Sequence, residues 1–396
     1  MELNHCTSLH SKCDIHTLDY IHDLTLPLNT GSPKFDMPSA VKEAISGNIN
    51  DTQYLTYPPL TGEVALHSLI ATTYRERHGV NTNENQILIT SGAMQAVQNI
   101  CRIEAGDGQD VLLPPPFWFK FPDIVSAAGG VPVLISTEAS NNFKLTPELL
   151  QASITDNSRL LVITNPNNPT GAIYNKSELQ ALLDVVCQYP DLKVLSDEVY
   201  NELLIGEGQE PCVSIGSLEP QPERVYTVNS MSKNFAMSGL RVGYVIAPQA
   251  SMGSLQTLQG LTTLGVNAAL QSGAINAISN TEQYTREIAV QLQPKLGRAS
   301  LLVAENPNLS FQMPLAGYYF YLDVNAYMGA STTDGTVIEN DEMLANYLEM
   351  EARVKVVPGT TCGVPGYFRI TFAIGDAELE AGLKAMNHTL NQLTLA

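Results

Sequence analysis

Lys233 stands among residues that could hold a phosphate group. In the run Asn-Ser-Met-Ser-Lys-Asn, Ser230 and Ser232 precede it, and Ser238 and Arg241 follow. Hydroxyl groups and an arginine suit an anionic phosphate, because charge-assisted and bidentate hydrogen bonds hold such a group well. A lysine beside a phosphate site has two possible uses, which are direct phosphate binding or a Schiff base with a carbonyl compound.

Asp197 helps to choose between these two uses. It lies in Ser-Asp-Glu-Val-Tyr, directly after an apolar run that predicts a strand. Alone, such a carboxylate could be a metal ligand, a helix N-cap or the partner of a cation. Together with Lys233 a pyridinium partner fits best, because an ionised carboxylate keeps a pyridine nitrogen protonated and lets the ring accept electrons. Asn168 and Tyr200 could then donate hydrogen bonds to a ring oxygen.

Two other classes of protein, a serine hydrolase and a non-catalytic sensor, fit the sequence less well. The run from Ser230 to Lys233 matches Ser-x-x-Lys, the nucleophile motif of penicillin-binding hydrolases, but the Lys-Thr-Gly element of that class is absent from the sequence. A non-catalytic sensor would have no need for Lys233, Asp197 and Arg369 together. The sequence also lacks a G-x-G-x-x-G loop, a Gly-Lys-Ser/Thr loop and a His-Glu-x-x-His motif.

Over about residues 25–385 the sequence resembles the class I/II aminotransferases, the fold type I family of pyridoxal phosphate enzymes. Each motif is weak alone, but all occur in the order of the family. They are Tyr57-x4-Gly62, Thr90-Ser91-Gly92-Ala93, Phe117-Trp118, Asn167-Asn168-Pro169-Thr170-Gly171, Asp197-x2-Tyr200, Ser230-x-Ser232-Lys233, Arg241 and Arg369.

The resemblance implies a role for each residue. Lys233, Asp197 and Tyr200 would be catalytic, with Lys233 holding pyridoxal phosphate as a Schiff base and then shuttling the α-proton. Trp118 would stack on the ring. The other expected cofactor contacts are Ser91, Gly92, Ala93, Met94, Asn168, Ser230, Ser232 and Arg241. Substrate would contact Gly31, Trp118, Asn168 and Arg369, the last clamping the α-carboxylate, and no metal is expected. Tyr57 would reach the active site of a neighbouring subunit, so a homodimer is expected.

The resemblance also implies ping-pong transfer of an amino group between an amino acid and a 2-oxo acid. Relatives specialised for aspartate often carry a lysine where this chain has Met94, and a methionine cannot pair with a side-chain carboxylate. Aromatic residues at Phe119 and in the run 318–321 also favour a substrate side chain without charge. We therefore expect a neutral or aromatic amino donor, although Lys120 could supply a cation. A β-lyase, a cyclising synthase and an acyl-condensing enzyme use the same fold and stay open as alternatives.

The elements that must position these residues are strands alternating with helices. Apolar runs at 87–90, 110–113, 131–135, 160–164, 193–196, 225–229 and 242–246 predict strands, and helices are expected at about 38–46, 63–78, 93–103, 124–128 and 176–187. Such alternation favours a mostly parallel sheet that is covered on both faces. Ligands bind at the carboxyl ends of such strands, where Ser91, Asn168, Asp197 and Ser230 fall.

After about residue 285 the pattern changes to a long helix at about 283–306 and strands near 318–324, 354–356 and 368–372. We predict an α/β fold of type I. Its large cofactor-binding domain, residues 51–282, would contain a mostly parallel seven-stranded sheet flanked by helices. The smaller α+β domain would contain residues 1–50 and 283–396, with an N-terminal arm.

Composition limits the partners and the compartment. A net charge of −19 should repel nucleic acid and anionic membranes, and no apolar run is long enough to span a bilayer. Six scattered cysteines and the absence of a signal-peptide pattern favour a reduced, cytoplasmic protein. The N-terminal cluster of His5, Cys6, His10, Cys13 and His16 fits no zinc spacing, so a solvated arm is expected there.

Overall fold

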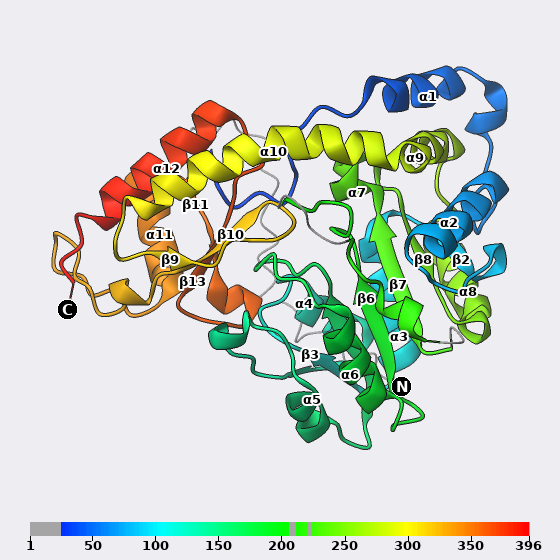
Figure 1. Ribbon diagram of the computed structural model, residues 1–396, viewed down its shortest axis with the longest axis horizontal. Helices are drawn as coiled ribbons and strands as arrows, with labels where there is room; N and C mark the ends of the chain where they lie inside the picture. Colours follow the sequence, from blue (N-terminus) through cyan, green and yellow to red (C-terminus); the bar gives the residue numbers. More distant parts are fainter. Residues whose placement is uncertain (1–24, 206–210, 220–222, 396) are drawn as a thin grey trace, which may run out of the picture.

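The structure, a computed structural model, describes residues 25–205, 211–219 and 223–395. The N-terminal histidine and cysteine cluster lies outside the described residues. A large and a small sheet organise the described chain, and the long helix α10 (Thr281–Ala304) runs from the helices of the large sheet to those of the small one (Figure 1).

The large sheet has seven strands in the order β2-β8-β7-β6-β5-β3-β4. Five neighbouring strands are parallel, whereas β8 runs antiparallel to β7 and β2. The mostly parallel sheet that we predicted is thereby confirmed. The strands are β2 (Ile87–Thr90), β3 (Asp110–Leu113), β4 (Val131–Leu134), β5 (Ser158–Thr164), β6 (Lys193–Asp197), β7 (Val225–Ser230) and β8 (Gly243–Ile246).

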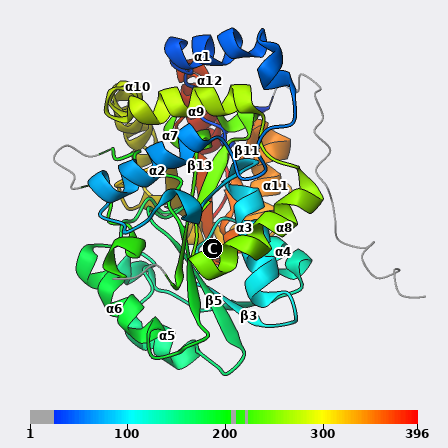
Figure 2. The same ribbon diagram turned by 90° about the vertical axis from the view of Figure 1, so that its right-hand side faces the viewer.

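Both faces of this sheet are buried because successive side chains of a strand point to opposite sides. In β5, Leu160 and Val162 pack with one group of helices, and Leu161 and Ile163 pack with another. Figure 2 shows α5 and α6 on one side of the sheet and α3, α4 and α8 on the other. The helices are α1 (Ser39–Ile49), α2 (Val64–Arg77), α3 (Gly92–Ala105), α4 (Phe121–Ala128), α5 (Pro147–Ser153), α6 (Lys176–Val186), α8 (Met252–Thr262) and α9 (Ala268–Ser279).

The small sheet has four antiparallel strands in the order β12-β13-β10-β9. Its core joins buried phenylalanines of the sheet to apolar residues of α10, α11 and α12. A separate short strand, β1 (Leu26–Pro27), pairs in parallel with β11, so the start of the described chain joins its C-terminal part. The other elements are β9 (Ser310–Phe311), β10 (Tyr319–Asp323), α11 (Asp341–Ala352), β11 (Val354–Lys355), β12 (Val357–Pro358), β13 (Tyr367–Thr371) and α12 (Asp376–Leu390).

The N-terminal fifty residues do not all join the small sheet. Helix α1 packs instead against α9 of the large part, where the Ser272 hydroxyl donates to the Ala44 carbonyl. The helix also continues through Gly47 to Ile49, so its predicted end at about residue 46 was wrong. The domain boundaries at 51 and 282 stay a prediction.

Helix α10 contains Pro294 in its interior. Proline has no amide hydrogen, so the carbonyl of Val290 loses its usual helical donor. The residues on both sides bond outward, since Gln293 donates to the carbonyl of Ile205 and Lys295 donates to that of Ile374. The middle of α10 is therefore tied both to the segment after β6 and to the small sheet.

Candidate active site

A cavity of about 490 Å³ opens where the carboxyl ends of β5, β6 and β7 face the small sheet. This is where a doubly covered parallel sheet binds ligands. The lining brings together residues that are far apart in the sequence: Asn29, Gly31, Ser32, Ala93, Met94, Val97, Trp118, Phe119, Asn168, Asp197, Val199, Tyr200, Ser230, Ser232, Lys233, Ser238, Arg241, Tyr319 and Arg369.

Lys233 reaches this cavity from α7 (Met231–Asn234), a single turn that begins directly after β7. Ser230 caps the turn, with its hydroxyl accepting from the Ser232 amide. The Lys233 amine donates to the Gly31 carbonyl over 2.6 Å. Burial lowers the pKa of Lys233, and so do the positive charges of Arg369 and Arg241. A lowered pKa gives more of the uncharged amine, which is the form that attacks carbonyls and accepts protons.

Asp197 ends β6 on the floor of the cavity and is only 6 % exposed. Burial raises its pKa to about 6, whereas the Val199 amide, 3.3 Å from Oδ1, and the charge of Lys233 act in the opposite direction. A bound cation would favour the ionised carboxylate. The site therefore suits a protonated ring nitrogen at Asp197.

Glu198 lies beneath this floor as a second buried carboxyl group. It accepts hydrogen bonds from the hydroxyls of Ser196, at 2.9 Å, and Ser214, at 2.6 Å. Burial raises its pKa to about 7, and the neighbouring charge of Asp197 adds to the effect, whereas the Ser214 hydrogen bond and His78 lower it. Glu198 does not line the cavity, and sequence analysis did not single it out.

Arg241 and a group of serines form one end of the cavity. The Arg241 guanidinium donates to the Ser238 carbonyl at 2.8 Å and lies 3.5 Å from Ser232 Oγ. Gly92 begins α3 beside it with φ of +74°, and a Cβ added to Gly92 would lie 2.2 Å from Arg241 Nη2. Glycine suits both the positive φ and this close approach of the arginine. Hydroxyls and a guanidinium at a helix start form a suitable cradle for phosphate.

Arg369 of β13 forms the opposite end and is 3 % exposed. Its Nη2 donates to the Asn29 carbonyl at 2.9 Å, and its Nη1 donates to Asn168 Oδ1 at 3.3 Å. The guanidinium lies over the Tyr319 ring, 4.5 Å from its centroid. The buried Nε has no hydrogen-bond partner among the described residues. A buried arginine that keeps a free donor is suited to binding a carboxylate.

Aromatic side chains complete the walls. Trp118 lines the cavity and packs edge-on against Phe121. The hydroxyls of Tyr200 and Tyr319 lie 3.2 Å apart. Met94 is 40 % exposed at the rim.

Three predicted residues do not line the cavity. Ser91 and Gly92 lie behind Arg241, and the Ser91 carbonyl accepts a long hydrogen bond of 3.4 Å from it. Tyr57 is 85 % exposed at the surface and is not among the residues that line the cavity. The alternative cation, Lys120, also lies outside the lining, 3.6 Å from Asp123.

Sequence analysis did not assign a site role to Asn29, Ser32, Phe119 or Tyr319. The sequence did offer a signal for Phe119 and Tyr319, because both belong to aromatic runs that were noted as indications of the substrate. Asn29 contributes only its backbone carbonyl. A backbone contact leaves no trace in residue type, so this one could not be predicted.

Comparison with known proteins identifies the family. The family model described as aminotransferase class I and II matches residues 25–386. The chain belongs to this family. The probable aspartate/prephenate aminotransferase of Rickettsia prowazekii is 31 % identical over 369 residues, which cover 93 % of this chain and 92 % of the relative.

Solved structures agree with this assignment. The crystal structure of the aspartate aminotransferase from Rhizobium meliloti has a TM-score of 0.88 and 29 % identity, and the match covers 93 % of this chain and 92 % of the other. The aromatic aminotransferase from Pyrococcus horikoshii has a TM-score of 0.84 and 28 % identity, covering 93 % and 96 %. The predicted fold type I architecture is confirmed.

The protein is therefore a pyridoxal phosphate-dependent aminotransferase, and the hydrolase alternative was wrong. The site fits this cofactor, since the amine of Lys233, the buried carboxyl of Asp197 and the cradle at Arg241 share one cavity. Within the described residues, no helix combines the length and the apolar composition that a bilayer crossing requires. The same parts of the chain contain no group of three or more metal-binding side chains.

Proposed function

We propose that this aminotransferase moves an amino group between an amino acid with a neutral or aromatic side chain and a 2-oxo acid, in a ping-pong cycle. The observation that supports this proposal is the number of cationic side chains in the cavity lining. Three cationic side chains line it, and each has a use already. Lys233 serves the chemistry, Arg241 the phosphate and Arg369 the α-carboxylate, so no described cation of the lining is left for a second substrate carboxylate.

The rest of the wall suits an uncharged side chain. Met94, Trp118, Phe119 and Val97 all face the cavity. Lys120 stays beside Asp123 and its amine lies 5.4 Å from the Phe119 ring centroid. Burying a side-chain carboxylate against this surface without a partner would be costly.

The proposed roles follow from the geometry of the chain. Arg369 holds the α-carboxylate, and its contacts with Asn168 and Asn29 fix the guanidinium in place. Lys233, with its lowered pKa, removes a proton from the α-carbon of the amino donor, passes it on within that half-reaction, and donates a proton to the α-carbon of the acceptor in the reverse half-reaction. Bound pyridoxal phosphate supplies the electron sink for this carbanion. Asp197, Asn168 and Tyr200 would hold the ring of the cofactor, and Trp118 would keep water away from it.

The relatives leave aspartate as the competing donor. These relatives include aspartate, aspartate/prephenate and aromatic aminotransferases. Half-reaction spectra of the holoenzyme with tyrosine, phenylalanine, leucine and aspartate separate these donors. We expect the neutral and aromatic donors to convert the cofactor fastest. Rapid conversion by aspartate alone would overturn the proposal.

A substitution at Met94 sharpens this test. Met94→Lys places a cation at the rim of the cavity and should raise kcat/KM for aspartate by about fivefold, since a partly exposed ion pair contributes on the order of 1 kcal/mol. Met350→Lys adds the same charge to α11 at a position that is 72 % exposed, and should leave aspartate turnover unchanged. Equal effects from both variants would mean that Met94 has no part in specificity.

We also propose that the active unit is a homodimer in which Tyr57 reaches the neighbouring active site. Exposed apolar side chains support this idea, since Tyr57 lies near Leu55, Leu261 and Leu264, all at least half exposed. The residues just after Tyr57 pack against Gly260 and Gly265, which places these side chains on adjoining segments. Such a patch often marks an interface.

Light scattering of the holoenzyme should give the mass of a dimer, and Tyr57→Phe should weaken cofactor retention. A monomer with full activity would contradict this arrangement. Formation of pyridoxamine phosphate together with a 2-oxo acid distinguishes transamination from a β-lyase, a cyclising synthase or an acyl-condensing enzyme. The cytoplasmic location stays a prediction, supported by four free cysteines among the described residues.

A further inference from the structure

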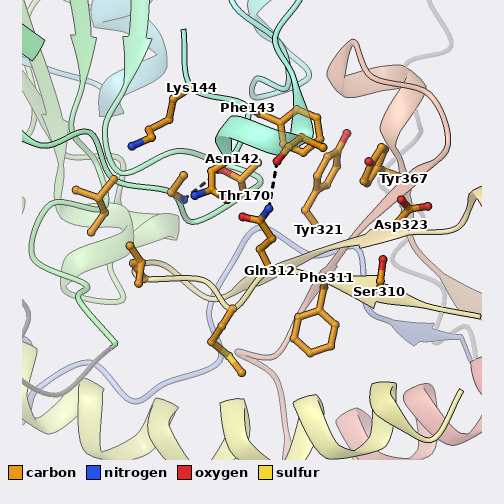
Figure 3. Close-up of a pocket in the computed structure, with 15 residues that line it drawn as sticks. Asn142, Phe143, Lys144, Thr170, Ser310, Phe311, Gln312, Tyr321, Asp323 and Tyr367 are labelled. Atoms are coloured by element: carbon orange, nitrogen blue, oxygen red, sulfur yellow. Dashed lines mark hydrogen bonds between the residues drawn. The ribbon is translucent and has the colours of Figure 1, made fainter. Parts of the chain in front are cut away.

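A second cavity, of about 320 Å³, lies between the large and the small sheet (Figure 3). Residues 139–144 and 170–173 of the large part line one side, and β9, β10 and β13 line the other. Gln312 bridges the two parts by donating to the Ala139 carbonyl at 3.1 Å, and the Leu315 amide bonds to the Gly171 carbonyl at 3.0 Å. None of its lining residues lines the active-site cavity.

Three aromatic rings gather at one end of this second cavity (Figure 3). Tyr321 and Tyr367 are stacked with centroids 4.8 Å apart, and Phe143 meets both edge-on at 5.7 Å and 5.4 Å. Asn142 and Phe143 both have φ near +55°, which is uncommon for residues other than glycine. The backbone is thus held in an unfavourable form at the point where it presents the Phe143 ring.

Two charged side chains, Asp323 and Lys144, line this cavity. Asp323 lies beside the aromatic rings, and its Oδ1 accepts from the amide and the side chain of Asn325, both at 2.9 Å. Lys144, on the opposite side, is paired with Glu178, so the described lining offers an anion no free cation. Ring faces and a carboxylate together attract cations. The net charge of −19 adds to this attraction.

The second cavity shares its structural elements with the substrate site. Thr170 lines it and lies two residues from Asn168, while Tyr321 lines it and lies two residues from Tyr319. Across the ladder from β10 to β13, Tyr321 is the direct partner of Arg369. A ligand held against Tyr321 and Thr170 would therefore act on the two elements that fix the Arg369 guanidinium.

We propose that this second cavity is an effector site for a small aromatic cation, and that its occupancy changes the affinity of the substrate site at Arg369. The aromatic group of the ligand packs along Tyr321 and Tyr367, and its ammonium group faces Asp323. This rests on the proposed role of Arg369 for the effect on substrate, whereas binding itself does not depend on that role.

Calorimetry of the holoenzyme with benzyltrimethylammonium tests the binding step. This probe has no N–H group, so it cannot react at Lys233 as a substrate amine does. We expect saturable binding that Asp323→Asn weakens about tenfold. The asparagine keeps an oxygen to accept from Asn325, so the turn is retained. Tyr367→Leu should also weaken binding, whereas Asp334→Asn, an exposed acid outside the cavity, should not.

Two controls separate this site from the active site. Benzoate, which has the ring but the opposite charge, should give no binding at the second cavity. In steady-state assays, the probe should change KM for the amino donor at least about twofold while kcat stays the same, and the change should vanish in Asp323→Asn. Absence of saturable heat, or equal affinity of wild type and Asp323→Asn, would overturn the site. Binding without any change in KM would overturn the effector role, whatever the donor proves to be.

Discussion

The floor and the roof of the active-site cavity are built in different ways. Asn168, Asp197 and Lys233 of the floor lie at or just after the ends of three adjacent strands of a single sheet. The roof, with Gly31, Tyr319 and Arg369, combines the N-terminal segment with two strands of the other sheet, and hydrogen bonds join the pieces. A floor fixed by one sheet suits the cofactor, which stays bound, and a roof assembled from separate segments suits a substrate that enters and leaves.

The largest expected effect tests the floor. Lys233→Ala removes the amine that is held by the Gly31 carbonyl, and turnover should fall about 10³-fold or more, because both the nucleophile and the proton carrier are lost. An absorbance spectrum of the purified variant should lack the band of the lysine-bound cofactor. A variant that keeps this band and its activity would place the chemistry elsewhere.

The next prediction concerns Glu198 beneath the floor. Its pKa rises on folding from 4.5 to about 7, so its contribution to stability is complete below pH 4.5 and is lost as the pH rises to about 7. The loss amounts to roughly 3 kcal/mol. Glu198→Gln should remove this dependence, so its stability relative to wild type should rise between about pH 5 and about pH 8.

Thermal unfolding of the two proteins at several pH values measures this difference. Glu339→Gln, at an exposed position, should follow the wild-type curve. A constant offset between Glu198→Gln and wild type across this range would mean that Glu198 does not titrate there.

Arg369→Lys tests the roof alone. Lysine keeps the charge but loses the planar fork that binds a carboxylate through two donors, so kcat/KM should fall about 100-fold. The band of the lysine-bound cofactor should remain before substrate is added, because Lys233, Asp197 and Arg241 are unchanged in this variant. If the variant failed to retain cofactor, the floor and the roof would not be independent.

Gly92→Ala should have the smallest effect of the four. The new Cβ would meet the Arg241 guanidinium, and the positive φ would be strained, so cofactor affinity should drop about tenfold. Gly239→Ala is the matched control in the neighbouring loop, where a Cβ would meet nothing within 4 Å. Equal retention of cofactor in the two variants would show that Arg241 can move aside without loss.

The same contrast explains what the sequence could predict. Strands β2 and β3 were predicted with the correct bounds, and the site residues at strand ends followed, because apolar runs and turn residues are local signals. The reversed direction of β8 and the pairing of β1 with β11 are not local. Helices α5, α8, α9, α11 and α12 were not predicted. The Tyr319 ring under Arg369 depends on a register between β10 and β13 that residue types do not encode.

Pro294 gives α10 a preferred place to bend. Because the carbonyl of Val290 already lacks a helical donor, flexing there breaks one backbone hydrogen bond fewer than flexing at an unbroken turn. The N-terminal half of the helix continues from α9, and the C-terminal half packs against α12 beside the small sheet. A bend between residues 290 and 294 would change where the small sheet, and Arg369 with it, lies relative to Lys233.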